Sequence, residues 1–104
     1  MISMNHERKI LLAGFLKYMG FNRKKIINEG IDSRIKAQKL VYFGEVLGLP
    51  LNYDFNLYLY VLYSSGLTND YFSITDEEWA NGKIDISTNV PDFLDQLKGR
   101  SALF

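Results

Sequence analysis

The feature that most constrains the fold is a change of hydrophobic period inside residues 34–70. Apolar residues recur three or four positions apart over residues 34–47, which predicts an amphipathic helix. Apolar and polar residues then alternate over residues 53–63, which predicts a strand with one buried face. Because a helix and a strand must share a core here, we predict an α+β fold that is mostly helical, with a small two-stranded β element.

The length and composition fit one compact domain spanning residues 1–104. Its 47% apolar and 23% charged residues are ordinary for a folded chain of this size. The chain has no cysteine, which excludes disulfides and thiolate metal sites. No apolar run approaches the roughly 20 residues of a membrane-spanning helix, and the N-terminus lacks a signal-peptide layout. We therefore expect a cytoplasmic protein without a membrane partner.

Capping and stop residues predict where the helices begin and end. The predicted helices, with their signals, are residues 5–20 (capped by Asn5, ended by Gly20), residues 32–47 (capped by Asp32 or Ser33, ended by Gly48 and Pro50), residues 64–73 (capped by the Ser64-Ser65 pair), residues 75–80 (a capping box from Thr75 to Glu78, with Trp79 as an apolar anchor) and residues 89–99 (ended by Gly99).

The strand over residues 53–63 is expected to pair with residues 83–87, which also alternate. Its apolar face belongs on the helices, and its other face carries tyrosines whose hydroxyls reach water. Gly44 lies inside the second predicted helix, where it costs about 1 kcal/mol relative to alanine. We expect the strand to approach the helix closely there. The apolar face consists of Phe55, Leu57, Leu59 and Val61.

The net charge of zero conceals a segregation of charge along the chain. Residues 1–39 hold nine Lys or Arg and three acids, whereas residues 40–104 hold three bases and nine acids. Two interpretations are open. The two halves either form solvated faces that attract each other within the fold, or the basic half meets nucleic acid or an acidic partner.

No arrangement of side chains predicts catalysis, a metal site or a cofactor. His6 is the only histidine, and we expect it to be an exposed polar residue. The Ser64-Ser65 pair lacks a base and an orienting acid, so helix capping explains it. Asp76, Glu77 and Glu78 suit a helix N-terminus, and adjacent acids point in different directions, which disfavours a metal.

Two short motifs resemble a known family. The first is a helix of the type K-x-Q-K-L-x-Y, formed here by Lys36, Gln38, Lys39, Leu40 and Tyr42. The second is an extended Y-G-P-Y-S motif, which here reads Tyr60-Val61-Leu62-Tyr63-Ser64. Over residues 30–75 the chain resembles the YwgA-like family, which is similar to the SocA-like or Panacea antitoxin domains. Val61-Leu62 replaces Gly-Pro, which removes a bend and should let the strand continue.

The resemblance implies a non-enzymatic module that binds a protein. Antitoxin-type relatives bind a toxin or bring a client protein to a protease, so an antitoxin, adaptor or inhibitor role is expected, and a short version of such a family would suit a virus- or plasmid-encoded inhibitor. The partner is expected to be a toxin, a protease client or a host factor, and a homo-oligomer stays open. The expected partner-binding residues are Lys36, Gln38 and Lys39, on the polar side of the second helix, and Tyr58, Tyr60 and Tyr63.

The alternative is a small DNA-binding regulator of helix-turn-helix or winged type. Phosphate contacts would come from the basic N-terminal half, and residues 83–87 would act as a wing. Tyrosine-rich strands also stack on bases, but no Lys or Arg lies between residues 40 and 82. The residues expected to contact nucleic acid are Arg23, Lys24, Lys25 and Arg34.

Overall fold

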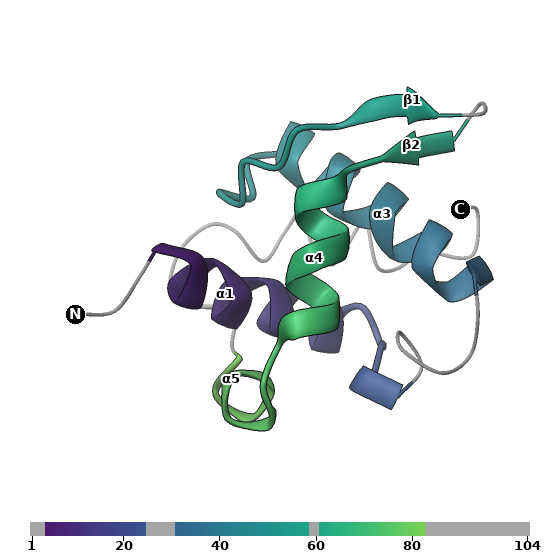
Figure 1. Cartoon of the computed structure of the whole chain (residues 1–104). Coiled ribbons are helices and arrows are strands. Elements are labelled where there is room, and N and C mark those ends of the chain that lie inside the picture. The colour runs from purple at the N-terminus through teal and green to yellow at the C-terminus, as the bar shows by residue number, and fades with distance from the viewer. Residues whose placement is uncertain (1–3, 25–30, 59–60, 83–104) are drawn as a thin grey trace.

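The computed structural model describes residues 4–24, 31–58 and 61–82. The described elements are α1 (Met4–Tyr18), α3 (Ile31–Val46), β1 (Asn56–Tyr58), β2 (Val61–Tyr63), α4 (Ser65–Ser73) and α5 (Asp76–Asn81). Figure 1 shows the β1–β2 hairpin at one end of the molecule, α5 at the other, and α1, α3 and α4 between them. The prediction of a mostly helical α+β fold with a two-stranded sheet is confirmed.

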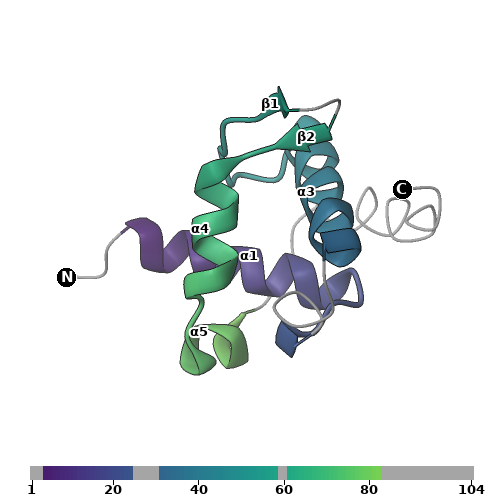
Figure 2. The same ribbon diagram turned by 45° about the vertical axis from the view of Figure 1, so that its right-hand side comes forward.

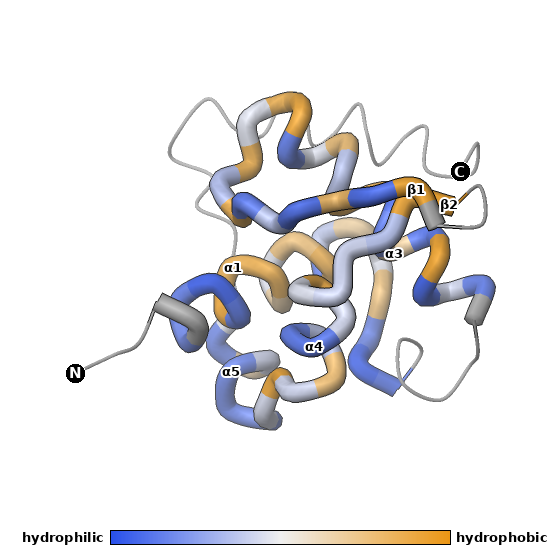
Figure 3. The backbone as a smooth tube through the Cα atoms, turned by 45° about the horizontal axis from the view of Figure 1, so that its top comes forward, coloured by the Kyte–Doolittle hydropathy of each residue, from blue (hydrophilic) through white to orange (hydrophobic). Residues whose placement is uncertain are grey.

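Helix α1 supplies the centre of the core. Leu12, Phe15 and Leu16 are fully buried, and the middle of α1 is orange in Figure 3, whereas α5 is mostly blue. The helix begins at Met4, so Asn5 lies inside it and is not its cap. Its predicted stop is confirmed, because Gly20 adopts a left-handed φ of 92° that only glycine reaches without strain.

Helix α3 packs on α1 through a glycine. A Cβ atom on Gly44 would lie 3.2 Å from the ring of Phe15 and 3.1 Å from Leu49, so the close approach expected at Gly44 exists. The approaching groups come from α1 and the segment after α3, and the prediction that the strand makes this approach is wrong. The helix begins at Ile31, before Asp32, and the stop at Gly48 is confirmed by its φ of 116°.

The tyrosine-rich segment folds into a hairpin and not into one long strand. β1 and β2 pair antiparallel, with Asn56 opposite Tyr63 and Leu57 opposite Leu62. Because opposite residues share a face, Leu57 shares its face with Leu62, and the expected face that combined Leu57 with Val61 is wrong. Leu59 and Tyr60 lie outside the described residues. Val61-Leu62 lies in strand β2, but the chain has already reversed its direction before this pair.

The two strands of the hairpin differ in their position relative to α3. β2 packs against α3, and β1 is the outer strand, as Figures 1 and 2 show. This explains why Leu57 on β1 is 74% exposed, although it was expected in the core. The sheet partner predicted at residues 83–87 and the helix predicted at residues 89–99 lie outside the described residues.

Helices α4 and α5 begin as predicted. The Ser64 hydroxyl accepts a hydrogen bond from the backbone N–H of Leu67, and Thr75 and Glu78 form a reciprocal capping box. Leu67 and Tyr71, which the helical spacing predicts on the core-facing side of α4, are buried, and Trp79 is partly buried against the core. The helical spacing in the sequence also predicts Leu47 and Phe72 in the core, and this prediction is wrong, because Leu47 is 49% exposed and Phe72 is 41% exposed.

Candidate functional site

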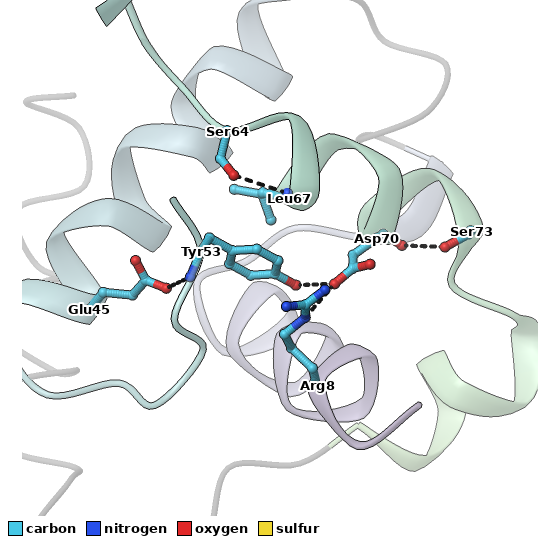
Figure 4. Close-up of polar contacts among 7 residues, drawn as sticks. All are labelled: Arg8, Glu45, Tyr53, Ser64, Leu67, Asp70 and Ser73. Carbon is cyan, nitrogen blue, oxygen red and sulfur yellow. Dashed lines mark hydrogen bonds and ion pairs between the residues drawn. The ribbon is translucent and has the colours of Figure 1, made fainter. Parts of the chain in front are cut away.

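A polar cluster of Arg8, Tyr53 and Asp70 joins α1, the segment after α3 and α4 (Figure 4). One carboxylate oxygen of Asp70, Oδ2, accepts from Arg8 Nε at 2.8 Å and from the Tyr53 hydroxyl at 2.6 Å. The Arg8 guanidinium carbon lies 4.6 Å from the centroid of the Tyr53 ring, within the range of a cation–π contact. Asp70 and Tyr53 are both buried, so the charge of Asp70 is compensated inside the protein.

Glu45 on α3 extends this cluster. Its Oε1 atom accepts a hydrogen bond of 2.6 Å from the backbone N–H of Tyr53. Burial raises the pKa of Glu45 above its usual range, and the hydrogen bond from Tyr53 only partly offsets this effect. Together, the cluster and Glu45 fix Tyr53, which lies three residues before β1.

The electrostatics of the cluster favour a structural role. Burial and the hydrogen bond to Asp70 raise the pKa of the Tyr53 hydroxyl far above its usual range, so the phenol stays protonated at neutral pH. Burial opposes the charge of Arg8, but the hydrogen bond and the charge of Asp70, together with the interactions with Tyr53, outweigh it and raise the pKa of the guanidinium. Asp70 accepts hydrogen bonds from Arg8 and from the protonated hydroxyl of Tyr53. This arrangement is suited to holding the three chain segments together.

This cluster was not predicted from the sequence. Arg8, Tyr53 and Asp70 are not among the residues that the sequence predicted to form a site. A signal for Asp70 does exist in the sequence, because it follows Leu67 by three positions and precedes Tyr71, on the apolar face of the predicted helix. A carboxylate on the core-facing side of a helix requires a buried partner.

Gln38 is a correction to the predicted partner-binding residues. Its side chain is only 3% exposed, so it does not lie on the polar side of α3. Its Oε1 accepts from the backbone N–H of Ser64 at 2.9 Å, and its Nε2 donates to the Thr68 hydroxyl at 2.9 Å and to the Ser64 carbonyl at 3.3 Å. Gln38 therefore satisfies buried polar groups where β2 passes into α4.

His6 is also placed differently from the prediction. It lies at the start of α1, 39% exposed, with Nδ1 2.7 Å from Oε2 of the buried Glu78 on α5. Burial opposes the charge of Glu78, but the hydrogen bonds from Thr75 and His6 outweigh it and lower the pKa of the carboxyl. The pair holds α5 against α1.

The basic residues expected to contact nucleic acid differ in whether they contact other parts of the chain. Arg23 is paired with the carboxylate of Asp76, and the guanidinium of Arg34 lies 5.4 Å from the centroid of the Phe72 ring. Lys24 is exposed, and Lys25 lies outside the described residues. Two of the four residues therefore contact other parts of the same chain.

The remaining predicted partner-binding residues lie on two neighbouring elements. Lys36 and Lys39 are half-buried on α3, and Tyr63 on β2 is 40% exposed. β2 packs against α3, so the structure brings these elements together. Tyr60 and the side chain of Tyr58 lie outside what the structure describes. Among the described large apolar residues, Leu57 has the largest exposed fraction, although its place on the predicted apolar face of the strand put it in the core.

In the described part of the chain, no group of three or more His, Cys, Asp or Glu residues is arranged to hold a metal ion. The helices of residues 4–24, 31–58 and 61–82 include none that is long and apolar enough to cross a membrane. A scan against protein-family models and searches of curated proteins and of solved structures find no match to this chain.

Proposed function

We propose that this chain is a protein-binding module of the antitoxin, adaptor or inhibitor type, without chemistry of its own, and that its contact surface is centred on the outer strand β1. The observation that carries the proposal is Leu57, which is 74% exposed on that strand. Burying a leucine side chain contributes about 1.5–3 kcal/mol, so an interface that covers Leu57 gains substantial stability.

The surroundings of Leu57 support the proposal. Leu62 lies opposite it on the same face of the hairpin, whereas Tyr63, which pairs with Asn56, lies on the other face and is 40% exposed. Aromatic and large apolar side chains are enriched at the centres of protein interfaces. The hairpin therefore presents Leu57 on one face and Tyr63 on the other, at one end of the molecule (Figure 2).

The polar cluster supports binding by holding the hairpin in place before a partner arrives. Tyr53 is fixed by Asp70, Arg8 and Glu45 three residues before β1, and Gln38 fixes Ser64 directly after β2. Both ends of the hairpin are thus tied to helices. A binding element that is already ordered loses less conformational entropy when it binds.

The contact surface differs from the one expected from the sequence. Gln38 is buried and leaves the surface, whereas Leu57 joins it. Lys36 and Lys39 stay as flanking residues because α3 packs next to β2. The role itself, sequestering or recruiting a protein, is the one implied by the resemblance to antitoxin-type domains.

The test is capture of partners from host lysate with the tagged chain, with and without nuclease. Wild type is compared with Leu57→Lys and with the matched control Ala80→Lys, which adds the same charge at an exposed position on α5, far from the hairpin (Figure 1). We expect a stoichiometric protein that survives nuclease and is retained by Ala80→Lys but lost by Leu57→Lys. Recovery of nucleic acid, or of partners lost after nuclease treatment, would favour the DNA-binding alternative.

A further inference from the structure

The outer strand has one edge that pairs with β2 and one edge that faces away from it. Within the described residues the sheet consists of β1 and β2 alone. β2 lies between β1 and α3 in Figures 1 and 2, so the far edge of β1 faces away from the helices. The backbone N–H and C=O groups on such an edge can pair with another extended chain.

The edge lacks the features that usually prevent such pairing. Proteins protect edge strands with charged side chains, proline, bulges or a covering element. Asn56, Leu57 and Tyr58 include neither a charge nor a proline. Leu57 is the most exposed of the large apolar residues in the described structure, which argues against a covering element at this point.

Two carboxylates lie at the start of the strand. Asp54 is exposed and lies two residues before β1. Glu45 accepts a hydrogen bond from the backbone N–H of Tyr53, the residue directly before Asp54. The two acids are close enough that the charge of Asp54 adds to the effect of burial in raising the pKa of Glu45. Arg8, whose charge also acts on Glu45, is bonded to Asp70. Asp54 and Glu45 therefore form an acidic entry at the start of β1, whereas the residues of β1 itself are uncharged.

We propose that β1 binds an extended segment of the partner protein as an added strand, with apolar residues facing Leu57 and a Lys or Arg at the end beside Asp54 and Glu45. This inference rests on the proposed protein-binding function and specifies its partner. In strand addition, backbone hydrogen bonds supply affinity, and side chains on alternate positions supply specificity. The basic residue meets the acidic entry, and the apolar residues cover Leu57.

A second copy of this chain fits the edge less well than a partner segment does. If β1 of one copy paired with β1 of another, Asp54 and Glu45 of each copy would lie next to the hairpin segment of the other copy. Residues 41–82 contain no Lys or Arg, so this segment offers no base to Asp54 or Glu45. Charge complementarity therefore selects a different protein with a basic residue next to an apolar strand.

The first experiment is selection of a random heptapeptide phage library on the immobilised chain, with Leu57→Lys used to remove peptides that bind elsewhere. We expect a consensus of alternating apolar residues that ends in Lys or Arg. A consensus that is acidic or rich in proline, or no Leu57-dependent consensus at all, would overturn strand addition.

The second experiment measures the binding of a selected peptide to matched variants. Leu57→Lys should weaken binding by about tenfold or more, given the contribution of a buried leucine. Asp54→Asn should weaken it by about two- to fivefold and reduce its salt dependence, as expected for an exposed ion pair. Ala80→Lys should leave the affinity unchanged. Equal affinities for wild type and Asp54→Asn would overturn the acidic entry as a recognition element.

Hydrogen exchange separates strand addition from other modes of binding. The backbone amides of β1 that point away from β2 should become protected when the peptide binds. A peptide that depends on Leu57 but leaves these amides unprotected would overturn strand addition while leaving the protein-binding function intact. A Leu57-dependent dimer in sedimentation velocity, or binding of a peptide with the sequence of residues 83–87, would instead assign the edge to this chain itself.

Discussion

The Tyr53 hydroxyl donates a hydrogen bond of 2.6 Å to Asp70, and this single bond connects the segment that leads into the hairpin with helix α4. The same oxygen of Asp70 also accepts from Arg8 on α1. The position of the exposed strand thus depends on a buried carboxylate in another element.

Tyr53→Phe should lower the free energy of unfolding by about 1–3 kcal/mol, because it removes a buried hydrogen bond to a charged group. The measurement is urea unfolding at pH 7. Tyr42→Phe is the matched control, since it keeps the edge-to-face ring contacts of Tyr42 with Phe43 and Phe55. An equal loss in the two variants would contradict the role of the Tyr53 hydroxyl.

Gln38→Leu should destabilise the fold by about 1–3 kcal/mol, because it leaves the buried N–H group of Ser64 without its hydrogen-bond partner. Asn69→Leu makes a similar exchange at an exposed position of α4 and should change stability little. Thermal unfolding compares the two variants. If Gln38→Leu retained wild-type stability but lost the captured partner, Gln38 would be a contact residue after all.

Glu45→Gln should change how stability depends on pH. Because folding raises the pKa of Glu45, its contribution to stability is fully present below about pH 4.5, the usual pKa, and is lost as the pH rises through the raised value. Glutamine still accepts the hydrogen bond from Tyr53 but does not titrate. Urea unfolding from pH 4 to pH 7 should show the variant gaining stability relative to wild type as the pH rises. A constant difference would contradict the shift, and the exposed Glu7→Gln serves as the control.

Charge reversal of both Lys36 and Lys39 to Glu should weaken binding of the captured partner while leaving the melting temperature nearly unchanged. Both side chains are half-buried on α3, next to the hairpin, and rim charges mainly affect the rate of association. Surface plasmon resonance should therefore show a slower association and a small change in dissociation. Unchanged kinetics would remove this face of α3 from the contact surface.

The helices were predictable because their signals are local. Gly20, Gly48 and the Thr75–Glu78 capping box each act within one helical turn, and each stands where the sequence places it. The predicted caps of the first two helices were wrong, because Asn5, Asp32 and Ser33 all lie inside these helices. Such boundaries depend on contacts outside the turn that carries the signal.

The hairpin could not be predicted from alternation alone. Residues 53–63 keep a period of two throughout, and no Asn-Gly or Asp-Gly pair marks a reversal between Tyr58 and Val61. The reversal moved Leu57 onto the face shared with Leu62 and placed it on the outer strand. Sequence alternation indicates which residues share a face only as long as the chain does not turn back.

The polar cluster needed the tertiary structure because its members are 17 to 62 residues apart in the chain. The position of Gln38 on α3 also could not be predicted without the tertiary structure. It lies beside Ala37 and one turn from Val41, both buried, and was assigned to the polar side because of its residue type. A polar side chain on the buried side of a helix needs a hydrogen-bond partner from another part of the chain. For Gln38 this partner is the backbone of Ser64, which only the tertiary structure identifies.

The most direct test of the central claim is the dissociation constant of the captured partner for wild type, Leu57→Lys and Ala80→Lys, measured by isothermal titration calorimetry. The protein-binding surface on β1 predicts that Leu57→Lys binds at least about tenfold more weakly, while Ala80→Lys binds like wild type. Equal affinity of wild type and Leu57→Lys, with both variants folded, would contradict the claim and move the contact surface away from the outer strand.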